Sequence, residues 1–423
     1  MSCNGTEPTT KTPTTTISRR RLLAAGAAGA FAALAGEQLS TQLAFAADSS
    51  YAGDVLVLLS LRGGFDGLSA VVPAGDAAYY AARPTIGVPK AQLIGGDGYF
   101  GLNPALAPLL PFWQAGTFGA IQAVGQPAPN RSHFAAMEEL ERAAPGTSIR
   151  TGWLDRMMGG LGAANPFAAV SVGGAMPARV LAGPAPSLGL TSVDAFTLNG
   201  DQAGRPMAAT MAALYSGAPA VLAQTTQQVT AALTTTAALK AAGYTPANGA
   251  VYPDTDLGDA LRDVARLIKA DVGLMSACVD FGDWDMHEDL GTAVTGKRMF
   301  DHLNGLALAL AAFAADLGVT GLGKVTLLTI SEFGRRVGQN ASGGLDHGYG
   351  NAMFLLGGAV QGGRVHGRWP GLAPASLVDG DLAVTTDYRA VIGEILSTRC
   401  GVGDISAVFP GVKASSLGLA RAR

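Results

Sequence analysis

The sequence is poor in charged residues, in aromatic residues and in cysteine. Only 14% of its 423 residues are Asp, Glu, Lys or Arg, and 7% are aromatic. The formal net charge is −3, so the chain lacks the basic surplus with which nucleic-acid-binding proteins attract phosphate. It also lacks a Cys-x-x-Cys motif and a Gly-x-Gly-x-x-Gly fingerprint after a strand. A redox protein is therefore the least favoured of the functions considered below.

The chain has three cysteines, Cys3, Cys278 and Cys400. Cys3 lies in a segment that we expect to be removed during export. The other two allow either one disulfide in an oxidising compartment or two buried free thiols.

The N-terminus has the organisation of an export signal. Residues 1–16 are polar and rich in Thr and Pro, and residues 18–23 (SRRRLL) resemble a twin-arginine motif. An Ala/Gly-rich stretch follows at 24–36, and Ala-Phe-Ala at 44–46 fits a cleavage site before Ala47. We predict a signal peptide at 1–46, export by the twin-arginine translocase, and a mature protein in the periplasm or secreted. The apolar stretch is too short and Gly-rich for a stable membrane span, although an uncleaved anchor is the alternative.

The mature part, 47–423, is long enough for one large α/β domain or two smaller ones. Four near-continuous apolar runs predict buried strands of one mostly parallel sheet, at 54–61, 118–124, 274–281 and 325–330. Amphipathic helices are predicted at 256–270 and around 300–317. Residues 175–255 read as a cap or insert on a single α/β domain.

Polar residues follow three of these strands. Asp66 comes after the first strand, and Asp283, Asp285 and His287 come after the third. Because ligands bind at the carboxyl ends of parallel strands, and Asp-x-His spacing suits a cation, these residues are candidate metal ligands. The alternatives are a turn-forming Asp66 and a solvated acidic loop at 282–289.

The last of the four strands leads into Glu332, Arg335 and, in the next loop, His347. Ser132, preceded by Arg131 and followed by His133, stands at the predicted start of a helix after the second strand. There the helix dipole would favour an anion and activate an oxygen nucleophile, but simple helix capping explains Ser132 equally well. His302, on the stripe of a core helix, reads as structural.

Several motifs together closely resemble the domain-of-unknown-function 1501 (DUF1501) family, over residues 54–411. They are LRGGFDGL, RSHF, DWDMHED, SEFGRR with GGLDHGYGN, TTDYRAV and VFPG. The family is similar at a distance to the alkaline phosphatase/sulfatase superfamily. That resemblance implies a mostly parallel central sheet with helices on both faces and a metal-dependent site at the strand ends.

The resemblance also implies roles for individual residues. It makes Asp66, Glu332 and His347 metal ligands, together with Asp283 or Asp285 and His287, and it puts Ser132 near the nucleophile position. Phe333 departs from the pattern, because the superfamily has His there. That difference makes one ion, or none, credible instead of two.

These observations favour an exported metal-dependent hydrolase of phosphate or sulfate esters. One or two zinc, manganese, calcium or iron ions would activate the nucleophile, and Arg131, Arg335 or Arg336 would orient a small anionic ester. The alternative is a non-catalytic binding or scaffold protein that retains the fold.

Overall fold

A computed structural model describes residues 51–201 and 206–423. The described residues belong to one compact unit. The predicted signal peptide at 1–46 lies outside the described residues, so its assignment stays a prediction.

A central sheet organises the described chain. Its strand order is β10-β4-β9-β8-β1-β7-β5-β6, and β13 also pairs with β4. β1 is parallel to both β7 and β8, whereas β9 is antiparallel to its neighbours β8 and β4. The strands are β1 (Val55–Leu61), β4 (Phe118–Gly125), β5 (Ala169–Val172), β6 (Leu188–Leu190), β7 (Ser276–Phe281), β8 (Val325–Ile330), β9 (Asn351–Gly357), β10 (Val365–His366) and β13 (Thr386–Asp387).

All four predicted strands exist and share this sheet. β1, β4, β7 and β8 run in the same direction, since β4 and β8 are each antiparallel to β9. Their carboxyl ends therefore lie on one edge, as expected. The third strand begins two residues later than predicted, at Ser276.

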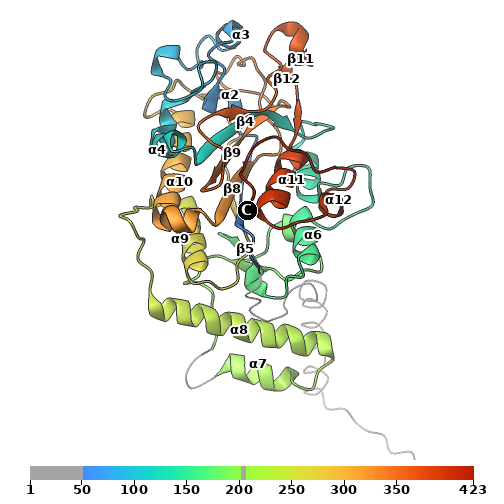
Figure 1. Cartoon of the computed structure of the whole chain (residues 1–423). Coiled ribbons are helices and arrows are strands. Elements are labelled where there is room, and N and C mark those ends of the chain that lie inside the picture. Colours follow the sequence, from blue (N-terminus) through green and yellow to red (C-terminus); the bar gives the residue numbers. More distant parts are fainter. Residues whose placement is uncertain (1–50, 202–205) are drawn as a thin grey trace, which may run out of the picture. The chain divides into compact units, whose positions relative to one another are not determined.

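Helices cover both faces of the sheet (Figure 1). Alternate residues of β1 face opposite ways because strand side chains have a period of two. Val57 and Leu59 join the core beneath α9 (Asp256–Lys269) and α10 (Arg298–Leu322), whereas Leu56 and Leu58 join the core beneath α6 and α11. The remaining helices on these faces are α4 (Leu110–Gln114), α5 (His133–Arg142), α6 (Trp153–Gly160), α11 (Tyr388–Arg399) and α12 (Ile405–Val408). The predicted α/β class, with a mostly parallel sheet between helical layers, is confirmed.

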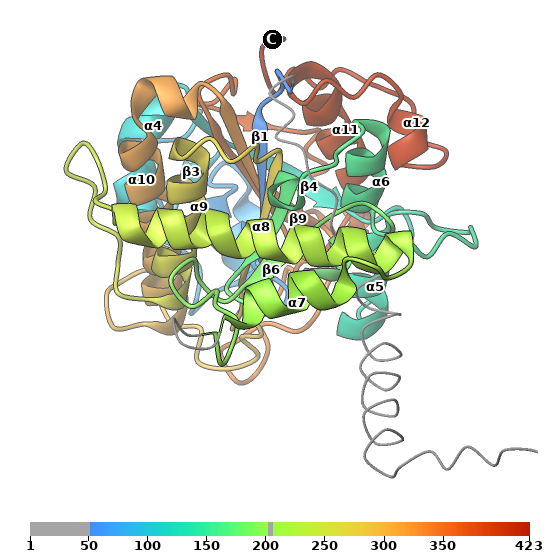
Figure 2. The same cartoon turned by 90° about the horizontal axis from the view of Figure 1, so that it is seen from below.

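Smaller elements complete the chain. Two short helices, α2 (Gly67–Ala70) and α3 (Ala77–Ala82), follow β1, and two-residue strands pair as β2 (Val71–Val72) with β3 (Gly101–Leu102) and β11 (Leu377–Val378) with β12 (Asp381–Leu382). In the 175–255 segment, α7 (Met207–Tyr215) and α8 (Ala220–Ala242) lie side by side beyond the β5–β6 end of the sheet (Figures 1 and 2). Its reading as an insert stays a prediction.

Among the described residues, one helix, α10, is long and apolar enough to cross a membrane. More than half of its apolar window is buried inside the protein, where Leu303, Leu306 and Leu310 belong to the core. Cys278 and Cys400 are free and buried, so the structure has buried thiols where a disulfide was the alternative.

Candidate metal centre

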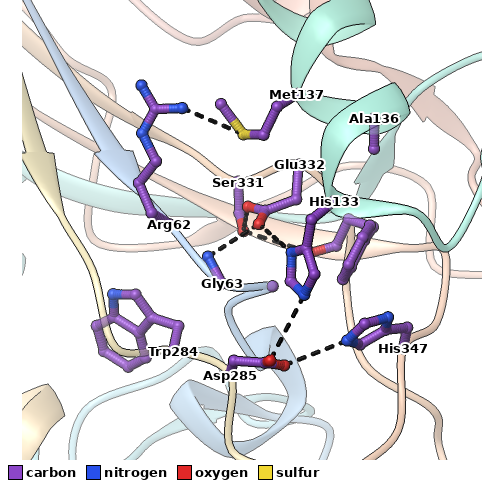
Figure 3. Close-up of polar contacts among 12 residues, drawn as sticks. Arg62, Gly63, His133, Ala136, Met137, Trp284, Asp285, Ser331, Glu332 and His347 are labelled. Atoms are coloured by element: carbon purple, nitrogen blue, oxygen red, sulfur yellow. Dashed lines mark hydrogen bonds and ion pairs between the residues drawn. The ribbon is translucent and has the colours of Figure 1, made fainter.

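The loops that follow β1, β7 and β8 meet because these strands are neighbours in the sheet. Two glycines after β1 make the close approach feasible. Both Gly63 and Gly64 have positive φ, and a Cβ on Gly63 would lie 2.7 Å from the backbone nitrogen of Asp285. Glycine is therefore required where the β1 loop passes the β7 loop. The loop after β4 adds the start of α5 to the same place (Figure 3).

Three side chains converge at this edge of the sheet, His133, Asp285 and His347 (Figure 3). One nitrogen or oxygen atom from each lies within 4.8 Å of those from the other two. His133 Nε2 is 3.6 Å from Asp285 Oδ2, and His347 Nε2 is 3.2 Å from Asp285 Oδ1. Two imidazoles and a carboxylate form a donor set that suits a divalent metal.

The far nitrogen of each imidazole meets an oxygen acceptor. His133 Nδ1 is 2.8 Å from Glu332 Oε1, and His347 Nδ1 is 2.9 Å from the backbone carbonyl of Arg131. Since a carbonyl or carboxylate oxygen only accepts, Nδ1 carries the proton in both residues, a tautomer inferred from these contacts. The Nε2 lone pairs of the neutral imidazoles therefore point at Asp285. Outer partners of this kind orient histidine ligands in metal sites.

In this arrangement three hydrogen-bond acceptors face one another, namely the Nε2 atoms of His133 and His347 and the Asp285 carboxylate. His133 Nε2 is buried and has no hydrogen-bond partner among the residues that the structure describes. A favourable contact requires either that an imidazole carries a proton on Nε2 or that a metal cation lies between these nitrogens and the Asp285 carboxylate. The residues present thus fit a metal ion, which would displace the protons when it binds.

His287 borders the same position. Its Nε2 is 3.0 Å from Asp285 Oδ1 and 3.0 Å from His347 Nε2, while its Nδ1 is 3.3 Å from Asp346 Oδ1. A hydrogen bond from Asn340 and the neighbouring His287 outweigh burial and lower the pKa of Asp346. His287 could therefore supply a fourth ligand, with Asp346 as its outer partner.

Arg335 fixes the position of Asp285. Burial raises the pKa of Asp285, but hydrogen bonds, above all that from Arg335 at 2.6 Å, outweigh this effect and lower the pKa to about 2. The rest of the buried guanidinium donates to the backbone carbonyls of Gly63, Gly64, Trp284 and Leu345. The Arg335 side chain is only 1% exposed, so the structure places it where it can position Asp285 and not where an anionic substrate would reach it.

Phe333 forms an apolar wall beside the two imidazoles. Its ring centroid is 4.8 Å from that of His133 and 4.6 Å from that of His347. The residue that departs from the superfamily pattern thus packs against two candidate ligands and offers no ligand atom. This supports room for one ion at the cluster.

Three predicted ligands lie outside the cluster. Asp66 is buried in an ion pair with Arg83, at 2.6 and 3.0 Å, and accepts from the backbone nitrogen of Ser69 at the start of α2. Asp283 is exposed and pairs with Arg298 at 3.0 Å. Asp66 therefore acts as the turn-forming and capping residue that was its alternative. Glu332 contacts His133 and lies behind the cluster, whereas Asp285 and His347 meet in it and His287 borders it.

The predicted catalytic residues of the β4–α5 loop occupy different positions. Ser132 is the exposed residue before α5 and makes no side-chain capping hydrogen bond. Arg131 is partly exposed and binds buried Asp381, at 2.5 and 3.0 Å, while its guanidinium lies over the ring of Tyr349. Arg131 contributes to the cluster through its backbone carbonyl, which holds His347.

Sequence reasoning did not include His133 among the candidate ligands and treated it as a neighbour of Ser132. A signal was present, because His133 is the first residue of α5 and follows the strand end that the prediction already used. His302, in contrast, is structural as expected. It is 2.7 Å from the carbonyl of Gly282 and stacks on Phe281, and burial lowers its pKa.

Comparisons with known proteins place the chain in a family. Searches of curated proteins gave no match. Among solved structures, the chain is similar to the C-terminal periplasmic domain of EcEptC from Escherichia coli in complex with Zn, with 10% identity and a TM-score of 0.33 over 75% of this chain and 76% of that chain. It is similar to lipoteichoic acid synthase LtaP from Listeria monocytogenes, with 9% identity and a TM-score of 0.30 over 82% and 79% of the two chains.

A family model described as "Protein of unknown function (DUF1501)" matches residues 113–392, which is more than half of the sequence. The match includes the β4–α5, β7 and β8 loops that build the cluster. The chain belongs to the DUF1501 family.

Proposed function

We propose that the protein binds one divalent metal ion through His133, Asp285 and His347, and that it is a metal-dependent hydrolase of phosphate or sulfate esters. One observation carries the metal site. Two imidazole nitrogens and a carboxylate face one another, and the nitrogen of His133 is buried without a partner among the described residues. His287 is the candidate fourth ligand. The ester class rests on the superfamily that the motifs resemble.

The donor set favours some metals over others. Imidazole nitrogens suit zinc and iron, whereas calcium prefers an all-oxygen shell. Manganese accepts mixed nitrogen and oxygen ligands. With Asp66 held by Arg83 and Phe333 offering no ligand atom, a single ion of zinc, iron or manganese fits better than a pair of ions or calcium.

The surrounding residues would orient an anionic substrate. A bound metal would supply charge neutralisation and would lower the pKa of a bound nucleophile. Arg131 and Arg336 are partly exposed and both lie near Asp381, at 2.5 and 3.8 Å, so positive charge borders the cluster. Ser132, exposed directly before His133, is the nearest candidate hydroxyl nucleophile in sequence. Asp285 is 46% exposed at its side chain, which leaves the cluster open to a substrate.

A metal-binding protein without turnover is the second candidate. The guanidinium of Arg335 is buried against Asp285 and backbone carbonyls, and among the described residues no hydrogen bond joins the Ser132 hydroxyl to the cluster. These observations favour a site that retains metal but lacks a positioned nucleophile.

Metal content and turnover together separate the two candidates. Protein purified without a metal-binding tag is analysed for zinc, iron, manganese and calcium, then assayed with p-nitrophenyl phosphate, bis-p-nitrophenyl phosphate and p-nitrocatechol sulfate. The hydrolase is supported if the parent contains metal and turns over a substrate, if His347→Ala abolishes this turnover, and if His302→Ala retains it. Metal without turnover on any of the three supports the binding protein, and folded protein that takes up no metal rejects both.

Export by the twin-arginine translocase to the periplasm, or beyond it, is part of the same proposal. The arginines at 19–21 and the cleavage site before Ala47 support it. Replacing Arg19, Arg20 and Arg21 by Lys should leave the precursor in the cytoplasm. Normal export of that variant would remove this part of the proposal without affecting the metal site.

A further inference from the structure

The helical hairpin α7–α8 is surface-exposed but carries almost no charge. From Pro206 to Leu239 the sequence has no Asp, Glu, Lys, Arg or His, although 14% of the whole chain is charged. The single charged residue of α8, Lys240, lies at its end and donates to the carbonyl of Phe196 at 2.9 Å. A solvated helix pair normally presents charged residues on its outer face.

The exposed side of the hairpin is apolar. None of the nine residues of α7, all of which the structure describes, is buried. Met207 is 42% exposed and Leu214 is 73% exposed. α7 packs along α8 on the side away from the sheet, where both helices face outward (Figure 2). The outer surface of α7 therefore lacks a partner within the described part of the chain.

The threonines of α8 make this surface less polar than its composition suggests. The hydroxyls of Thr226, Thr230 and Thr234 each donate to the carbonyl four residues earlier, at 2.9 Å. These hydroxyls are satisfied inside the helix, so they need no water. Thr226 is buried, whereas Thr230 is partly exposed and Thr234 is exposed. Thr230 and Thr234 are four positions apart and can pack against another helix without stranding a polar group.

We propose that α7 and α8 form a dimer interface with a second copy of this chain. A partner with a charged surface would lose water from its charges and find no counter-charge here. A membrane surface is disfavoured because the hairpin offers no Lys or Arg for lipid headgroups before Lys240. A second copy presents the same uncharged surface, and a two-fold axis pairs each hairpin with itself.

The hairpin is large enough for such an interface. α8 has 23 residues, which corresponds to a length of about 34 Å at ~1.5 Å per residue. A strip of that length and roughly 20 Å wide covers about 600–700 Å² on each chain, near the lower end of the ~1,200–2,000 Å² total of specific interfaces. An area of this size is sufficient for a specific dimer, and the concentration series below measures its affinity.

Sedimentation velocity from about 5 to 100 µM tests the proposal on the full mature chain. Leu214→Glu puts a charge on the exposed side of α7, and Val319→Glu is the control, since Val319 is 93% exposed on α10. The parent and Val319→Glu should form dimers, and Leu214→Glu should dissociate at least ten-fold more readily with unchanged thermal unfolding. Ala209→Lys, at another exposed position of α7, is the second interface variant.

Two results would overturn the proposal. The first is a parent that stays monomeric at the highest concentration, and the second is a dimer that Leu214→Glu and Ala209→Lys leave as tight as the parent. Flotation with neutral phosphatidylcholine vesicles is run in parallel. A monomeric parent that floats with vesicles, and whose binding Leu214→Glu abolishes, would assign the surface to lipid and reject the dimer.

Discussion

Replacing Glu332 by Gln separates a metal-supporting role from a purely structural one. Glu332 is buried and its Oε1 accepts hydrogen bonds from His133 Nδ1, at 2.8 Å, and from the backbone nitrogen of Gly63, at 2.9 Å. The amide oxygen of Gln can accept the same bonds, so the substitution removes the negative charge and keeps the shape. It should leave His133 in place but make its imidazole a weaker ligand.

The expected size of the effect follows from the charge on the acceptor. A hydrogen bond to a charged group contributes about 1.5–3 kcal/mol and one between neutral groups about 0.5–1.5 kcal/mol. The loss of roughly 1–1.5 kcal/mol at His133 corresponds to about a ten-fold weaker metal affinity. That value lies at the lower end of the ~10–100-fold range for outer partners of metal ligands. Glu332→Ala, which also leaves the Gly63 nitrogen without its acceptor, should lose more.

Competition with a chromogenic chelator measures the zinc affinity at neutral pH. Glu138→Gln is the matched control, because Glu138 lies on the exposed side of α5 and pairs only with Arg142 at 3.4 Å. Thermal unfolding of the metal-free variants is recorded separately. A Glu332→Gln variant that binds zinc within two-fold of the parent would refute the reasoning, even if its melting temperature fell.

Three further predictions test the surroundings of the site and the core. Arg335→Met should lower the free energy of unfolding by about 1–3 kcal/mol in urea titrations, because it leaves buried acceptors such as the Leu345 carbonyl without their donor, while the partly exposed Asp285 can bind water; a loss below about 0.5 kcal/mol would contradict this. Burial raises the pKa of Asp316, but hydrogen bonds, led by the one from Lys269, outweigh burial and lower this pKa. The ionised Asp316 therefore stabilises the fold above its unfolded pKa of ~3.9, and this stabilisation is lost as the pH falls below that value. Parent should therefore lose more stability than Asp316→Asn between pH 5 and pH 3, and parallel losses would refute the assignment. Burial raises the pKa of both Cys278 and Cys400, so neither thiol should react with a disulfide reagent until the protein unfolds, when both should react.

The strands could be predicted because their signal is local. The runs that became β1 and β8 are almost entirely aliphatic, and burial on both faces requires no more than that. Their parallel direction then brings the residues after β7 and β8 to one edge, which is why Asp285, Glu332 and His347 were found from the sequence.

The rest of the site depends on contacts between distant segments. Asp66 has the expected place after β1, but Arg83 binds it from 17 positions further along the chain. Arg335 follows the end of a strand, where a substrate-binding residue is expected. The neighbouring turns bury its guanidinium, however, and supply the carbonyls of Gly64 and Trp284 as acceptors. His133 follows β4, which lies next to β9 and is separated from β1 by β9 and β8. No local sequence pattern encodes that strand order, so the sequence did not reveal that His133 reaches the cluster.

Zinc titration of the untagged, metal-free protein by calorimetry tests the central claim most directly, with His133→Ala and His347→Ala measured beside the parent and His302→Ala. The account predicts about one equivalent bound by the parent and by His302→Ala, with binding that weakens as pH falls because protons compete for the same nitrogens. Each of the two ligand variants should bind at least 100-fold more weakly while remaining folded. Folded parent protein that binds no zinc, or binding that survives the loss of both imidazoles, would contradict the account.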